Sequence, residues 1–120
     1  MIGRAALLLA LTLSAAAAEP LAVEIASAEA AFDLRTSVPI VSFRMTPDSA
    51  RRFSELTANN VGRKMQVRVD GRPLMAPVIR EPILGGSGQI ADPSFTAEEV
   101  REIAARMASG RAKVEFEIVD

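Results

Sequence analysis

Residues 64–70, KMQVRVD, alternate strictly between polar and apolar side chains, with Met65, Val67 and Val69 on one face. A period of two residues is that of a β-strand with one buried face. The dipeptide that follows, Asp70-Gly71, is typical of a two-residue hairpin turn, because the turn needs residues that tolerate positive φ. The sequence therefore predicts a β-hairpin here, with one face against a core and the other toward water.

Three further segments show the same alternation and are predicted to be strands: residues 21–25, 38–45 and 113–119. The return strand of the hairpin, PLMAPVI, contains Pro77, which cannot donate a hydrogen bond to a neighbouring strand and so favours a sheet edge or a bulge. Residues 26–37 are ambiguous, because alanine and glutamate favour helix while the segment ends in turn residues. We interpret them as a continued strand and a loop.

Two segments carry helix start signals. In the first, Thr46 is a good N-cap, Pro47 suits the first helical position, and Gly62 is predicted to end the helix. In the second, Thr96 and Glu99 form a capping box, and a glycine again follows the segment. The buried stripes are predicted to comprise Ala50, Phe53, Thr57 and Val61 in the first helix and Val100, Ile103, Ala104 and Met107 in the second.

The predicted order of elements is β-β-α-β-β-α-β, with strands that each have one polar face. Such strands indicate a sheet that is covered on one side and open on the other. We therefore expect an α+β domain of ferredoxin-like type, in which a single-layer, mostly antiparallel sheet carries two helices on one face. Residues 19–120 suffice for one domain with one modest core.

The N-terminus has the three parts of a secretory signal peptide. A basic start ending at Arg4 precedes the apolar run AALLLALTL, and small residues follow at Ala16 and Ala18. The apolar run is short of the roughly 20 residues that a membrane span needs, so we expect cleavage after Ala18; an uncleaved anchor is the alternative. The chain has no cysteine, so a lipid anchor on a processed cysteine is excluded. Residues 19–120 are expected to be exported and to contain no membrane span.

The residue types present exclude most familiar catalytic sites. The sequence has no histidine and no cysteine, which removes the usual general base, the thiol nucleophile and most transition-metal sites. We therefore expect no catalytic residue, no metal and no cofactor, although an envelope hydrolase that uses Ser87 or another serine is a minor alternative. The 14 basic and 15 acidic residues nearly cancel, so we expect no binding to nucleic acid.

The cluster Gly85-Gly86-Ser87-Gly88 has two interpretations. A phosphate-binding loop would end in Gly-Lys-Ser/Thr and run directly into a helix. Here no lysine follows, and the next helix is predicted to begin only at Thr96. We therefore interpret the cluster as a turn or bulge at a sheet edge.

A series of motifs follows in a fixed order between residues 62 and 110: Asp70-Gly71, Ala76-Pro77-Val78-Ile79, Gly85-Gly86, Gln89-Ile90, Phe95-Thr96-Ala97-Glu98-Glu99 and Ser109-Gly110. In this order they resemble the periplasmic head subdomain of SecD, of the SecDF family, a membrane protein of protein export that works beside the Sec translocon. The strand and the Thr-Pro helix upstream fit as well, so the resemblance covers residues 38–110. The transmembrane segments of the family have no counterpart in these 120 residues, so proton-driven force generation is not implied.

The resemblance implies a non-enzymatic periplasmic or secreted domain that contacts extended or translocating polypeptide, or an envelope or translocon protein. The glycine turn with the apolar residues before it is the expected contact surface, beside the proline edge. The candidate site comprises Pro77, Arg80, Glu81, Pro82, Ile83, Leu84, Gly85, Gly86, Ser87 and Gly88. The alternative is a structural accessory subunit that docks on a membrane complex through the open sheet face, at Lys64, Gln66, Arg68, Glu115 and Glu117.

Overall fold

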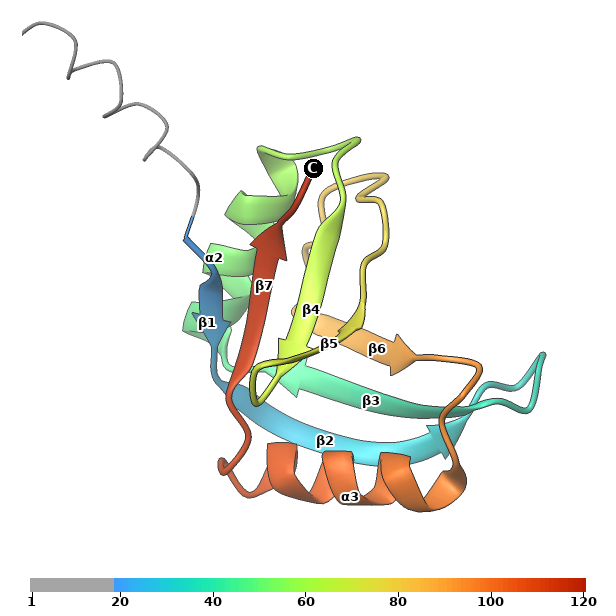
Figure 1. The fold of residues 1–120 in the computed structure, drawn as a ribbon. Coiled ribbons are helices and arrows are strands. Elements are labelled where there is room, and N and C mark those ends of the chain that lie inside the picture. The colour runs from blue at the N-terminus through green and yellow to red at the C-terminus, as the bar shows by residue number, and fades with distance from the viewer. Residues whose placement is uncertain (1–18) are drawn as a thin grey trace, which may run out of the picture.

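The computed structural model describes residues 19–120 (Figure 1), so the predicted signal segment and its cleavage site lie outside the described residues. The chain folds into seven strands and two helices within that range. They are β1 (Leu21–Val23), β2 (Ile25–Phe32), β3 (Pro39–Met45), α2 (Pro47–Ala58), β4 (Met65–Val69), β5 (Arg72–Met75), β6 (Ser87–Ala91), α3 (Ala97–Ala108) and β7 (Val114–Ile118). The predicted α+β class is confirmed.

The strands form two antiparallel sheets rather than the single layer that we expected. The first sheet has the order β1-β7-β4-β5, and the second has the order β2-β3-β6. The strands of one sheet run across those of the other (Figure 1). The division arises at Glu24, between β1 and β2, where the backbone N–H donates to Ser49 Oγ of α2 at 2.8 Å instead of to a strand. A ferredoxin-like arrangement is therefore not confirmed.

The helix start signals act as predicted. The Thr46 side chain accepts a hydrogen bond from the backbone N–H of Ser49, with Pro47 in the first turn. At α3, Thr96 and Glu99 make both bonds of the capping box. Each bond satisfies an N–H that a helix leaves unpaired at its start, so the two helices begin where the sequence places them.

The end of α2 differs from the prediction. The helix ends at Ala58, and Gly62 lies beyond it with a φ of +93°. The N–H of Gly62 donates to the carbonyl of Ile79 at 2.7 Å, so the chain leaves the helix early to pair with a distant segment. Val61, which we expected in the buried stripe, is 48% exposed for the same reason.

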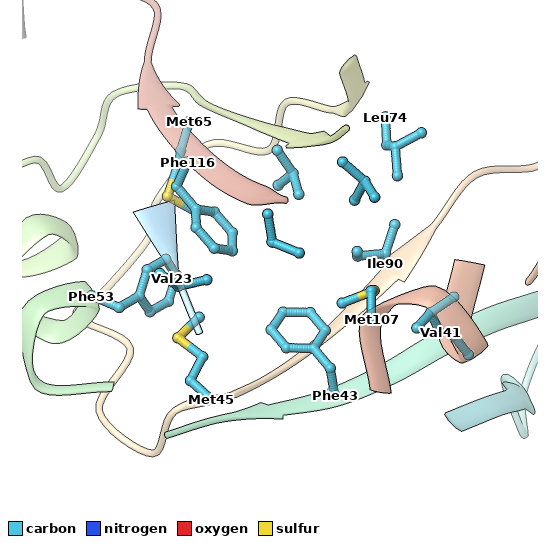
Figure 2. Close-up of a cluster of buried hydrophobic side chains, with 14 of the residues drawn as sticks. Val23, Val41, Phe43, Met45, Phe53, Met65, Leu74, Ile90, Met107 and Phe116 are labelled. Atoms are coloured by element: carbon cyan, nitrogen blue, oxygen red, sulfur yellow. The ribbon is translucent and has the colours of Figure 1, made fainter. Parts of the chain in front are cut away.

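One hydrophobic core joins both sheets and both helices (Figure 2). Phe53 of α2 lies against Phe116 of β7, with ring centroids 4.6 Å apart. From α3 the buried side chains are Val100, Ala104 and Met107, and Ile103 packs at the margin, so the predicted stripe of this helix is confirmed. Because every element contributes to one core, the relative positions of the two sheets are fixed by packing.

The hairpin between β4 and β5 forms at Asp70-Gly71, whose φ values of 54° and 81° are those that a tight turn requires. The Asp70 carboxylate accepts hydrogen bonds from the backbone N–H of Lys113 at 2.9 Å and from Arg106 Nη2 at 2.7 Å. The Lys113 N–H, followed by the Arg106 guanidinium, holds the pKa of Asp70 below its usual value. Folding therefore favours the ionised form of this side chain.

We predict that Asp70→Asn lowers the free energy of unfolding at pH 7, and that the difference from wild type shrinks as the pH falls below about 4. A carboxylate whose pKa is depressed in the folded state stabilises above its unfolded pKa, and this stabilisation is lost as the proton binds. Asparagine tolerates positive φ and keeps an oxygen for the Lys113 N–H, so the substitution removes mainly the charge. Urea unfolding at pH 7 and pH 3 measures the effect, and an equal difference at both values would contradict it.

Candidate functional site

The chain between β5 and β6, residues 76–86, is held against the first sheet at its beginning; we call it the β5–β6 segment. The carbonyl of Pro77 accepts a hydrogen bond from the N–H of Met65 at 2.9 Å, and the N–H of Ile79 donates to Arg63 at 2.9 Å. Lys64 and Val78 form an isolated bridge between these bonds. The segment thus continues the edge of the first sheet beyond β5, as the proline predicts.

A buried hydroxyl holds the middle of the β5–β6 segment. Thr57 of α2 is fully buried, and its Oγ1 accepts a hydrogen bond from the N–H of Ile83 at 2.9 Å. The same hydroxyl donates to the carbonyl of Ser54 at 3.1 Å. Ile83 therefore packs against the core, whereas the next residue, Leu84, is 74% exposed. The sequence placed Thr57 in the helix stripe but gave no sign that its hydroxyl binds a distant loop.

Close packing explains two glycines of the cluster. Gly86 is buried with a φ of +71°, and a Cβ there would lie 2.6 Å from Cβ of Ala50 in α2. A Cβ at Gly88 would lie 2.8 Å from Cζ of Phe43. The carbonyl of Gly86 also accepts a hydrogen bond from Met45 at 2.8 Å, so the cluster passes directly into β6, an edge strand. The predicted turn at a sheet edge is therefore right for Gly85 and Gly86, where the chain bends, whereas Ser87 and Gly88 already belong to β6.

The structure places most of the ten predicted site residues at the surface of the protein. Seven are exposed, Ile83 and Gly88 are half-buried, and only Gly86 is buried. The exposed ones are Pro77, Arg80, Glu81, Pro82, Leu84, Gly85 and Ser87. Gly86 thus supports the surface from below and is not part of it.

An apolar cleft of about 130 Å³ lies beside some of these residues. Four predicted residues line it: Pro77, Ile83, Ser87 and Gly88. The remaining walls come from the adjoining ends of β5 and β6, namely Met75, Gln89 and Ile90, and from elements elsewhere in the chain, namely Phe43, Phe53, Met65, Val67 and Phe116. No charged side chain lines the cleft, so its size and lining suit an apolar side chain. The sequence predicted most of these lining residues to be core residues and gave no sign of the cleft.

On the outer face of the first sheet, the alternative docking surface, Arg68, Glu115 and Glu117 pair with one another, whereas Lys64 has no ion pair among the described residues. Arg68 Nη1 lies 2.6 Å from Glu117 Oε1, and the same nitrogen donates to Gln66 Oε1 at 3.0 Å. Glu115 lies near Arg68 Nε at 3.8 Å and near Lys113 Nζ at 3.6 Å. The register of β4 and β7 sets Gln66 opposite Glu117 and Arg68 opposite Glu115, as cross-strand pairs. These groups therefore satisfy each other within the chain.

Within residues 19–120, no cluster of three or more acidic, histidine or cysteine side chains is placed to hold a metal ion. In the same residues, no helix has the length and apolar character that crossing a membrane requires.

The sequence of this chain is similar to that of known proteins of one family. The family model of the SecDF P1 head subdomain matches residues 9–114. The chain belongs to the SecDF P1 head family. The protein translocase subunit SecD of Thermobaculum terrenum is 36% identical over 96 residues, which are 80% of this chain and 18% of that protein. SecDF of Thermus thermophilus is 38% identical over 97 residues, or 81% of this chain and 13% of that protein.

Solved SecDF structures show the same fold. A structure of a membrane component SecDF that enhances protein export superposes with a TM-score of 0.68 and 37% identity, covering 81% of this chain and 43% of that one. The super-membrane-facing form of SecDF gives a TM-score of 0.67 and 39% identity, covering 76% of this chain and 13% of that one. The chain thus spans only the part of these relatives that forms a SecDF P1 head.

We predict that Gly86→Ala destabilises this P1 head by at least about 2 kcal/mol, because it combines backbone strain at positive φ with a clash against Ala50. Gly85→Ala is the matched control, since a Cβ there meets nothing within 4 Å. The control should change the free energy of unfolding by less than about 1 kcal/mol. Denaturant unfolding of both variants tests this, and equal losses would contradict the packing account.

We predict that Thr57→Val lowers the free energy of unfolding by about 1–3 kcal/mol, because it leaves the half-buried N–H of Ile83 without an acceptor. The amide of Ile83 should then exchange faster with solvent, since the middle of the β5–β6 segment loses its anchor. Ser54→Ala is the control, because it removes an exposed hydroxyl of the same helix. Hydrogen exchange measured by NMR would contradict the anchor role if the two variants protected Ile83 equally.

Proposed function

We propose that this P1 head binds extended polypeptide during protein export, as a non-enzymatic domain on the periplasmic side. The single observation that carries the proposal is the apolar cleft, which opens beside an unpaired edge strand. The cleft offers a pocket for an apolar side chain, and the strand offers hydrogen bonds to the main chain. Together they suit a ligand that is unfolded and varied in sequence.

The free edge of β6 follows from its register with β3. The carbonyl of Gly86 accepts a hydrogen bond from the N–H of Met45. Hydrogen-bonded pairs recur at every second residue, so Gly88–Phe43 and Ile90–Val41 are the next pairs in which both residues face each other with their N–H and C=O groups. In an antiparallel ladder the intervening residues direct their N–H and C=O groups to the other side. Ser87 and Gln89, which both line the cleft, therefore direct theirs away from β3. An extended chain can bond to these groups whatever its sequence.

Leu84 adds a second apolar contact beside the cleft. Its side chain is 74% exposed. The chain on both sides of it is held by hydrogen bonds, from the N–H of Ile83 to Thr57 and from the N–H of Met45 to the carbonyl of Gly86. Complete burial of a leucine side chain contributes about 1.5–3 kcal/mol. Because the loop is already ordered, little conformational entropy opposes that contact when a polypeptide covers Leu84.

Relatives of known structure support a role in protein export. One SecDF relative of known structure is described as a membrane component that enhances protein export, and another as translocon-associated. The predicted signal peptide fits a domain that works outside the cytoplasm. The accessory-subunit alternative has less support, because Arg68, Glu115 and Glu117 on the outer face of the first sheet pair within the chain.

We predict that a photo-crosslinker at position 84 reacts with exported chains that are arrested during translocation in cells, whereas one at position 34 does not. Leu34 is the matched control, because it is an exposed leucine, at 99%, in the β2–β3 turn and does not line the cleft. In binding assays with an unfolded precursor, Leu84→Ser should weaken binding about tenfold and Leu34→Ser should leave it unchanged. Equal crosslinking at both positions would contradict the proposal.

A further inference from the structure

A polar cavity of about 310 Å³ lies on the exposed face of the second sheet. Its polar lining consists of Ser27, Glu29, Ser42, Arg44 and Ser87. The strand register places Arg44 between Ser27 and Ser87 in one row across the sheet, and Ser42 opposite Glu29 in the next row. Strands β2, β3 and β6 therefore supply one guanidinium and several hydroxyl groups to the same polar cavity.

Arg44 has no ion pair or side-chain hydrogen bond with any other residue that the structure describes. Arg68 of the first sheet, in contrast, bonds to Glu117 at 2.6 Å. The Arg44 guanidinium is exposed at the cavity and carries only donors, and serine hydroxyls on both sides can add further donors. This combination matches a carboxylate, which takes paired N–H donors and accepts from hydroxyl groups.

Ser87 lines both the polar cavity and the apolar cleft. A chain that extends along the free edge of β6 at this residue directs successive side chains to opposite faces of the sheet. If one side chain enters the cleft, its neighbours point toward the cavity. Strands lie roughly 4.8 Å apart, so an added strand is about 10 Å from β3, a distance that an arginine and an acidic side chain span together.

We propose that this head prefers polypeptide in which an acidic residue is next to the apolar residue held in the cleft, with Arg44 binding the carboxylate between Ser27 and Ser87. The inference rests on the proposed binding of polypeptide. Glu29 lines the same cavity and repels a second acidic side chain, so the preferred segment carries one acid at this place. The ligand class is an extended segment in which an apolar and an acidic residue are adjacent.

The test uses the protein comprising residues 19–120 and short labelled peptides that have one central leucine in a serine and threonine background. Glutamate or glutamine occupies the position directly before or directly after the leucine, and fluorescence anisotropy gives the affinity. We expect glutamate in one of these positions to bind about two- to fivefold tighter than glutamine at low salt, with the difference lost at high salt.

Two variants assign the effect to the cavity. Arg44→Gln should abolish the preference for glutamate and leave the affinity for the glutamine peptides unchanged, whereas Glu29→Gln should strengthen binding of the glutamate peptides. Arg111→Gln is the control, because Arg111 is an exposed arginine outside both the cavity and the candidate site, and the preference should persist.

The outcomes separate this inference from the proposed function. Binding that depends on the leucine but is equal for glutamate and glutamine overturns the inference and leaves polypeptide binding in place. An equal loss for both peptides in Arg44→Gln also overturns it, because that result indicates a structural role. No binding of any peptide to the folded protein, or equal binding after the leucine is replaced by serine, overturns both.

Discussion

The absence of a side chain at two glycines allows two close contacts, one between α2 and the chain entering β6 and the other between neighbouring strands of the second sheet. Gly86 lets Ala50 of α2 meet the backbone, and Gly88 lets the ring of Phe43 lie over β6. These contacts place the free edge of β6 beside the end of β5, and the apolar cleft is the space that remains between them. The same contacts fix one end of the β5–β6 segment, so the exposed leucine within it has a defined position. The candidate site is thus a product of interior packing.

Much of the fold was predictable because its signals are local. Strict alternation identified β4 and β7, and the side chains of Thr46 and Thr96 marked where the helices begin. The division into two sheets was not predictable, since the alternation over residues 21–25 continues across the break at Glu24 without any turn signal. The break depends on a bond from Glu24 to Ser49, and β1 finds its partner only in β7, at the other end of the chain. Such pairings leave no mark within a short window.

The loop of the candidate site was predictable from the sequence, whereas the cleft and the part played by Arg44 were not. The loop with Leu84 could be found because an apolar pair next to glycines is unusual on a surface, and the family motif drew attention to the same residues. The cleft could not, because its walls come from both sheets and from α2. Arg44 was overlooked because an arginine on the polar face of a strand is ordinary in sequence. Only the register, which sets it between Ser27 and Ser87, distinguishes it.

The pairing of β1 with β7 has a mechanical consequence. The two strands are antiparallel neighbours, so residue 19 and residue 120 leave the domain at the same end of the first sheet (Figure 1). Tension applied through both ends would load the short ladder from Leu21–Phe116 to Val23–Val114 one pair at a time, as in unzipping, rather than shearing all of its bonds together. Under pull, β1 would therefore separate first, while the cleft, which contains no residue of β1, would stay assembled.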